Sequence, residues 1–230
     1  MIRMTHSILI DLSHTIADGT VTYPGLPAPR ISDYLSREDS RTHYTSGTEF
    51  QIGKLDMVGN TGTYLDSPFH RYGDGKDLSQ LPLSRLANLD GVLVRATSRQ
   101  GRAITEASFQ ELEARGIDLG GKAVMVQTGW SSHWGTEAYF EQNPFLTGGA
   151  AAFLCEKGAV LVGIDSLNID DTGDGTRPVH SILLKHGITV LEHLTGLESL
   201  PDSGFKLFAV PPKVAGFGTF PVRAFALVEQ

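Results

Sequence analysis

The alternation of short apolar runs with helical patterns restricts the fold of this chain more than any other feature of its sequence. Apolar runs of strand length lie at residues 7–12, 91–96, 123–127, 160–165, 188–191, 205–210 and 223–228. Helical patterns lie between several of these runs, at residues 105–115, 148–157 and 180–186. Strand–helix–strand units are typical of parallel pairing, whereas the last two runs have no helix between them. The pattern therefore predicts an α/β fold with a central mixed sheet or barrel and peripheral helices, and the first run reads as a buried strand.

The chain is predicted to form a single domain over residues 1–230. A chain of 230 residues buries roughly 70% of the surface that its unfolded form exposes, so folding needs no disulfide. No repeat, low-complexity tract or linker marks an internal boundary. Cys155 is the only cysteine and cannot form an internal bridge. This fits a reducing compartment and predicts a cytoplasmic location.

Charge and hydropathy narrow the class of partner. The formal net charge is −7, which opposes binding to nucleic acid because phosphates require a basic surface. No apolar run approaches the length of a membrane span. We therefore expect neither nucleic acid nor a membrane as a partner.

The segment 57–78 (MVGNTGTYLDSPFHRYGDGKDL) is dense in residue types that carry chemistry. Pro68 prevents a helix through its middle, so a turn must arrange Tyr64, Asp66 and His70. Polar turns supported by strands are common in active sites. The alternative is an ordinary surface loop in which aspartate and asparagine cap turns, and composition alone slightly favours that alternative.

A second polar cluster lies downstream. Asp165 ends a predicted strand, His180 opens a predicted helix, and Glu192 follows the apolar run at 188–191. A carboxylate at the end of a buried strand must be solvated, paired or bound to a metal. Aspartate, glutamate and histidine together suit Zn²⁺ or Mn²⁺. Each residue taken singly has a simpler interpretation than a metal ligand. His180 would be a residue at the start of a helix that is hydrogen-bonded to the backbone, and Glu192 would form a salt bridge at the end of a strand.

Residues 60–70 (NTGTYLDSPFH) resemble the signature H-x-G-T-H-x-D-x-P-x-H of the cyclase-like metal-dependent hydrolases, the family of bacterial kynurenine formamidase and isatin hydrolase. Further landmarks occur in the family's order, namely DLSH at 11–14, YPG at 23–25, TGW at 128–130, GIDS at 163–166 and PVRA at 221–224. The similarity covers nearly the whole chain. It implies a swivelling β/β/α architecture, and a homodimer or homotetramer whose subunits lend residues to each other's pockets.

The resemblance also implies roles for the matching residues. In the family, two signature histidines and the aspartate bind a divalent metal, and the aspartate can hold a second metal with a downstream histidine and glutamate. The last signature histidine transfers protons. Asp66 and His70 match the signature, and His180 and Glu192 match the downstream pair.

Two signature histidines are absent, because Asn60 and Tyr64 stand in their places. An amide oxygen is a weak ligand, and a phenol binds metal well only when deprotonated. The first metal position is therefore expected to be empty. The second keeps Asp66, His180 and Glu192, which are predicted to hold one Zn²⁺ or Mn²⁺ with a bound water molecule.

Two catalytic residues and three substrate contacts complete the predicted site. His70 is expected to shuttle the proton, and Tyr64 to donate a hydrogen bond to a developing oxyanion. Tyr23 matches an aromatic position that lines the family's pocket, and Asn60 and Trp130 are the other predicted substrate contacts. Trp130 has an alternative role as a core residue.

The resemblance implies hydrolysis of a small-molecule substrate, which is an amide, a cyclic amide or a lactone. Two alternatives stay open. One is a metal-independent lyase or dehydratase in which Tyr64, Asp66 and His70 perform acid–base chemistry. The other is a non-catalytic protein that binds a small molecule in the same pocket.

Overall fold

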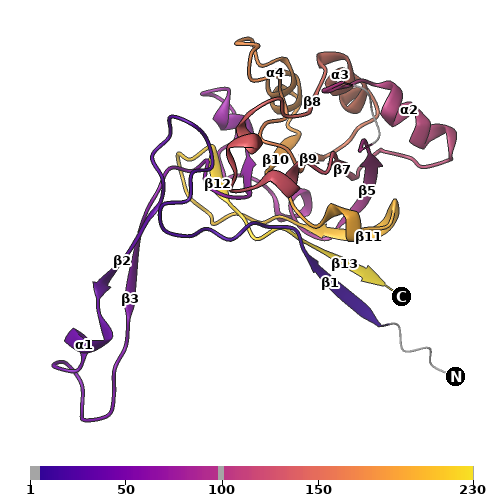
Figure 1. The fold of residues 1–230 in the computed structure, drawn as a ribbon. Helices are drawn as coiled ribbons and strands as arrows, with labels where there is room; N and C mark the ends of the chain where they lie inside the picture. Colours follow the sequence, from indigo (N-terminus) through magenta and orange to yellow (C-terminus); the bar gives the residue numbers. More distant parts are fainter. Residues whose placement is uncertain (1–5, 98–100, 230) are drawn as a thin grey trace, which may run out of the picture.

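The computed structural model describes residues 6–97 and 101–229, and a mixed sheet lies at its centre (Figure 1). The four middle strands run parallel: β5 (Leu89–Arg95), β7 (Ala123–Gln127), β9 (Leu161–Ile164) and β10 (Thr189–Glu192). The flanking strands pair antiparallel: β1 (Ser7–Asp11), β4 (Tyr64–Asp66), β11 (Ser203–Phe208), β12 (Thr219–Pro221) and β13 (Phe225–Glu229). In the described residues the order is β1-β13-β11-β5-β7-β9-β10-β4-β12. The predicted α/β fold with a mixed sheet is confirmed.

Three helices, α2 (Ala107–Ala114), α3 (Gly148–Glu156) and α4 (Pro178–Lys185), lie on one side of this sheet (Figure 1). Strand side chains alternate between two faces, and in β7 both faces are buried. Val124 and Val126 belong to the cluster that contains helix residues, such as Phe109 of α2. Ala123 and Met125 belong to the cluster on the opposite face. Burial on both faces explains why this strand reads as a continuous apolar run.

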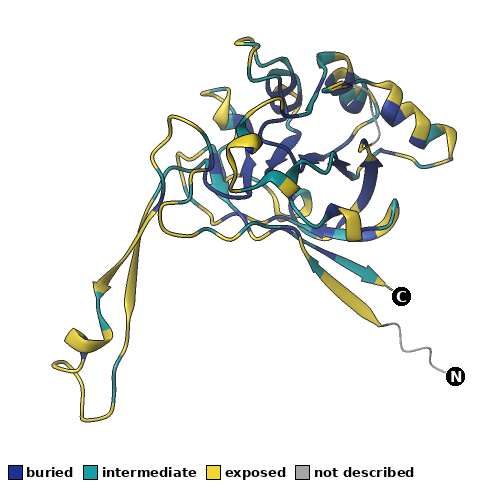
Figure 2. Ribbon diagram, in the orientation of Figure 1, coloured by how far each residue is buried: buried dark blue, intermediate teal, exposed yellow. Residues whose placement is uncertain are grey.

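The second face of the sheet curls around its own apolar cluster. Leu93, Met125 and Leu191 from the central strands meet Phe205 of β11 there. Gly91 permits this packing, because a Cβ at that position would lie 1.9 Å from the Phe205 ring. Buried segments accordingly fill the middle of the molecule in Figure 2. The result is one α/β domain built on a curled mixed sheet.

A two-stranded arm extends away from this body (Figure 1). It consists of β2 (Arg30–Leu35) paired antiparallel with β3 (Ile52–Asp56), and the short helix α1 (Arg37–Ser40) lies near its tip. Residues of both strands are almost all exposed (Figure 2).

Short elements complete the chain. They are the strands β6 (Ala103–Ile104) and β8 (Phe145–Leu146) and the 3₁₀ turns η1 (Pro68–His70), η2 (Leu83–Arg85), η3 (Trp130–His133), η4 (Glu137–Phe140) and η5 (Leu197–Ser199). Within the described ranges, every helix falls short of the length and apolarity that crossing a bilayer requires.

One expectation about the fold is wrong. The run at residues 7–12 was predicted to be a buried strand, but β1 is an exposed strand at the edge of the sheet. It pairs only with β13, and the two strands project beyond the helices (Figure 1). Leu9 is therefore 66% exposed.

Candidate metal centre and active site

Strand β4 and the turn after it position the signature residues. Tyr64 and Asp66 lie two residues apart and so share one face of the sheet. Glu192 lies directly opposite Tyr64 in the pairing of β10 with β4, which places it on that face too. Pro68 begins η1, which ends the strand and turns the chain back. His70 Nδ1 consequently lies 3.7 Å from Asp66 Oδ1.

Asp66, His180 and Glu192 converge on one point. Each offers one ligand atom, and the three atoms lie within 4.8 Å of one another. His180 Nε2 is 3.4 Å from Asp66 Oδ2 and 3.6 Å from Glu192 Oε1. All three residues are buried. The three predicted metal ligands are therefore brought together by β4, α4 and β10.

Asp170 orients the His180 ring. Its Oδ2 lies 2.6 Å from His180 Nδ1. Its carboxylate also accepts hydrogen bonds from the backbone N–H groups of Val179 (2.6 Å) and His180 (3.1 Å) at the start of α4. The proton of Nδ1 is thus directed at Asp170, and Nε2 faces Asp66 and Glu192. Metal-ligating histidines commonly bond a carboxylate through their other ring nitrogen in this way.

The electrostatics of this cluster favour a cation. Burial alone lowers the pKa of His180, but the carboxylates of Glu192, Asp170 and Asp66 outweigh it and raise that pKa to about 10. Burial raises the pKa of Glu192 to about 7, and the nearby charge of Asp66 adds to the effect. In the metal-free protein these carboxylates therefore hold a positive charge on the His180 ring, and a metal ion bound where Nε2 faces them would take the place of that charge.

The donor set fits a divalent metal ion. Asp66 Oδ2 is buried and receives no hydrogen bond among the residues that the structure describes. Such an orphaned carboxylate oxygen is costly unless a cation or donor satisfies it. One imidazole nitrogen and two carboxylate oxygens match the ligands that Zn²⁺ and Mn²⁺ accept. A metal ion at this point would satisfy the orphaned oxygen.

The hydroxyl of Tyr64 is hydrogen-bonded to Glu192. Its hydroxyl donates a 2.6 Å hydrogen bond to Glu192 Oε2, and both groups are buried. Burial, together with the charges of Glu192 and Asp66, raises the pKa of Tyr64 well above its usual value. The phenol therefore keeps its proton. Donation to a substrate oxyanion, the role predicted from the sequence, would require this bond to break.

Thr219 connects His70 to the metal cluster. Its hydroxyl donates to Asp66 Oδ1 and lies 2.7 Å from His70 Nδ1. Because the single hydroxyl proton goes to the carboxylate, Nδ1 of His70 must be the donor in the second bond. When the ring is neutral, Nε2 of His70 is then the nitrogen with the free lone pair. The His70 side chain is 36% exposed, so a substrate can reach it.

A cavity of about 470 Å³ opens onto this cluster. The lining residues include the predicted ones Tyr23, Asn60, Tyr64, His70, His180 and Glu192. The Pro/Gly-rich loop contributes an apolar wall through Pro24 and Leu26, and Arg71 and Arg177 add positive charge. Burial raises the pKa of Tyr23, although the neighbouring Arg177 opposes this shift.

Two other residues that the sequence singled out lie elsewhere. Trp130 is not among the residues that line the cavity, and its indole N–H donates to the Tyr139 carbonyl at 3.0 Å. Its contact with substrate stays a prediction. Asp165 accepts hydrogen bonds from Thr128 and Gly129, so it stabilises the turn after β7.

Three residues of the site were not predicted. Asp170 has acidic neighbours at Asp171 and Asp174, and nothing in the sequence distinguishes it from them. Thr219 reaches Asp66 because β12 pairs with β4, and no local pattern signals this. Arg177 lines the cavity from a left-handed backbone conformation, with φ of 49°.

Comparison with known proteins identifies the family of the chain. The cyclase family model, described as "Putative cyclase", matches residues 10–171. A kynurenine formamidase of Bacillus cereus (strain ATCC 14579) is 32% identical over 222 residues, which is 96% of this chain and 98% of the relative. A kynurenine formamidase of Bacillus cytotoxicus is 30% identical over 221 residues, with the same two shares.

Solved structures share the fold. An isatin hydrolase bound to the product analogue thioisatinate superposes with a TM-score of 0.83 at 23% identity, over 97% of this chain and 93% of that one. A potential metal-dependent hydrolase with cyclase activity gives a TM-score of 0.79 at 23% identity, over 98% of this chain and 100% of that one. The resemblance seen in the signature segment thus extends along the chain. The chain belongs to the cyclase family.

Proposed function

We propose that this protein is a metal-dependent hydrolase of a small amide, cyclic amide or lactone, with Asp66, His180 and Glu192 as ligands of one Zn²⁺ or Mn²⁺ ion. The observation that carries the proposal is the convergence of three buried ligand atoms beside a histidine that a substrate can reach. The names of the relatives support the reaction type. Kynurenine formamidases cleave a formamide, and isatin, the substrate named for isatin hydrolase, is a cyclic amide.

The chain's own residues supply proton transfer and orientation. A divalent ion at this site would lower the pKa of a water molecule and polarise the scissile carbonyl. His70 Nε2 accepts a proton from the attacking water and delivers it to the leaving nitrogen or oxygen. Thr219 holds the ring of His70 through Nδ1 in the orientation that exposes Nε2. Tyr64 keeps the carboxylate of Glu192 in place.

The cavity favours a substrate with an aromatic or apolar body. Tyr23, Pro24 and Leu26 line it together with His180 and Glu192 of the metal cluster. Arg71 and Arg177 line the same space. Their charge favours a substrate that carries an anionic group, or a carboxylate product, because guanidinium binds carboxylate well. Asn60 is a further candidate contact for the substrate.

Metal content and turnover together test the proposal. Protein purified without chelator is dialysed against Zn²⁺ or Mn²⁺ and analysed for bound metal, and hydrolysis of formanilide is followed by release of aniline. We expect about one metal ion per chain in the wild type. Glu192→Gln should lose both metal and turnover, whereas Glu198→Gln, at an exposed glutamate, should keep both. Turnover that survives complete metal removal would contradict the proposal and favour metal-independent acid–base chemistry by Tyr64 and His70.

We also propose that the protein is a homodimer or homotetramer that functions in the cytoplasm. The arm supports self-association, because it exposes apolar side chains on a two-stranded sheet that is marginally stable alone. Tyr34 is 77% exposed, Leu55 is 49% exposed and Ile31 is 48% exposed. Light scattering should give a multiple of the 24.8 kDa chain mass. Replacing Ile31 and Tyr34 with serine should lower that mass, and a monomeric wild type would contradict the proposal.

A further inference from the structure

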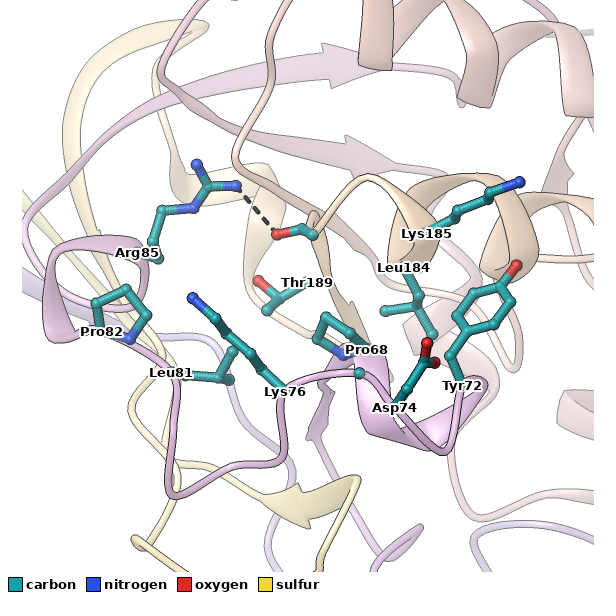
Figure 3. Close-up of a pocket in the computed structure, with 12 residues that line it drawn as sticks. Pro68, Tyr72, Asp74, Lys76, Leu81, Pro82, Arg85, Leu184, Lys185 and Thr189 are labelled. Carbon is teal, nitrogen blue, oxygen red and sulfur yellow. Dashed lines mark hydrogen bonds between the residues drawn. The ribbon is translucent and has the colours of Figure 1, made fainter.

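A second cavity, of about 630 Å³ (Figure 3), lies at the ends of α4 and β10 opposite to those that carry His180 and Glu192. His180 is in the first part of α4, and this cavity is lined by Leu184 and Lys185 at the end of that helix. Glu192 ends β10, and Thr189, which begins it, lines the cavity. No metal-cluster residue lines this space. It is therefore a separate place for a ligand.

Positive charge predominates around this cavity. Lys76, Arg85 and Lys185 line it, against a single carboxylate, Asp74. Among the described residues no carboxylate pairs with Lys76 or Lys185, although other lysines do form such pairs. Arg85 is held in place by its hydrogen bond to the Gly187 carbonyl at 3.0 Å. Figure 3 shows Asp74 beside Tyr72, across the cavity from Arg85.

Thr189 supplies an unsatisfied donor at the same spot. The residue is 1% exposed, and its hydroxyl has no hydrogen-bond partner among the residues described. Buried hydroxyl groups are normally paired, so an unpaired one that faces a cavity indicates a missing partner. In Figure 3 the hydroxyl of Thr189 and the ammonium group of Lys76 point toward the same part of the cavity, close to Arg85. Lys76, Arg85 and Thr189 are therefore among the donors available to an anionic ligand in this cavity.

The rest of the wall is apolar. Pro68, Leu81 and Leu184 line the cavity, and the Tyr72 ring lies at its far side in Figure 3. Tyr72 turns its hydroxyl away to donate to the Ser181 carbonyl at 2.8 Å. A ligand that fits therefore has a flat apolar body and one small anionic head. Phosphate alone would leave the apolar wall without a partner.

We propose that this cavity binds a small carboxylate with an aromatic body, with its head at Lys76, Arg85 and Thr189. The site is distinct from the metal cluster and does not depend on the hydrolase activity. Its walls nevertheless belong to the same elements, because Pro68 begins the turn that ends at His70.

Titration calorimetry with 2-naphthoate tests the proposal, with uncharged 2-naphthamide as the matched ligand. We expect 2-naphthoate to bind the wild type at least about tenfold more tightly than the amide. Lys76→Gln should weaken 2-naphthoate binding about tenfold, and Thr189→Val about threefold. Lys54→Gln, on the arm, should leave it unchanged, and His180→Ala should remove only the part of the binding that occurs at the metal cluster, whose cavity also accepts an aromatic acid.

Three outcomes would overturn the proposal. The first is that the wild type binds 2-naphthoate and 2-naphthamide equally tightly. The second is that the wild type shows no detectable binding of 2-naphthoate. The third is that His180→Ala no longer binds 2-naphthoate, whereas Lys76→Gln binds it as tightly as the wild type does. The last result would place the acid at the metal cluster instead. Because Lys76 is exposed, Lys76→Gln should fold normally even if Thr189→Val does not.

Discussion

Replacing Tyr64 with phenylalanine removes one hydroxyl group and leaves the ring. That hydroxyl donates a 2.6 Å hydrogen bond to Glu192 Oε2 in a fully buried setting. A hydrogen bond to a charged group contributes about 1.5–3 kcal/mol to stability. Loss of the donor also leaves a carboxylate oxygen buried without this partner. We therefore expect the free energy of unfolding of metal-free Tyr64→Phe to fall by about 1.5–3 kcal/mol.

Thermal and urea unfolding measure this change directly. For a chain of this size, each 1 kcal/mol corresponds to about 2–4 °C in Tm, so a decrease of about 3–12 °C is expected. Tyr44→Phe is the matched control, because Tyr44 is 44% exposed. A double-mutant cycle with Glu192→Gln isolates the energy of the pair from the other effects of each substitution. Equal stability of Tyr64→Phe and wild type would refute the claim that this bond holds Glu192.

Three further predictions follow from the same geometry. Asp170→Asn should weaken Zn²⁺ binding about 10–100-fold in a calorimetric titration, because it removes the charge that orients His180; unchanged affinity would contradict this role. Gly218→Ala should lower turnover while metal content is kept, because a Cβ there would lie 2.5 Å from the His70 backbone; full activity would show that the turn can shift without cost. Burial lowers the pKa of His14 from 6.5 to about 4, so the stability it contributes is present above pH 6.5 and is lost as the pH falls toward 4. The urea midpoint should therefore fall more between pH 7 and pH 4.5 for the wild type than for His14→Gln, and equal decreases would contradict the assignment.

The central strands and helices were predictable because their apolar residues follow the pattern of burial in the folded protein. The run at 123–127 coincides with β7, and the helical pattern at 148–157 matches α3 within one residue. The arm was missed because neither face of β2 or β3 is buried, so no period of two marks them. The first run was misassigned because an apolar strand is buried only where another layer covers it, and β1 lies at an uncovered edge.

The candidate site depends on contacts that are remote in sequence. Tyr64 and Glu192 are 128 positions apart, and Thr219 and Asp66 are 153 apart. Composition identified the residue types, and only the resemblance to a family joined the two halves of the site. Thr219 could not be found in either way, because its role arises from the pairing of β12 with β4. Long-range pairing of this kind leaves no local periodicity to read.

The hydrogen bonds around the cluster support the proposal of a single metal ion there. Asp66 Oδ1 accepts from Thr219, so Oδ2 is the oxygen left for a cation. His180 Nδ1 is bonded to Asp170, which leaves Nε2. Glu192 Oε2 accepts a hydrogen bond from Tyr64. Glu192 Oε1 accepts one from the Ile169 N–H at 2.6 Å. Because a carboxylate oxygen has two lone pairs, Oε1 keeps one for a cation. Each residue therefore offers one atom to one point, and three protein ligands leave coordination positions open for water and substrate.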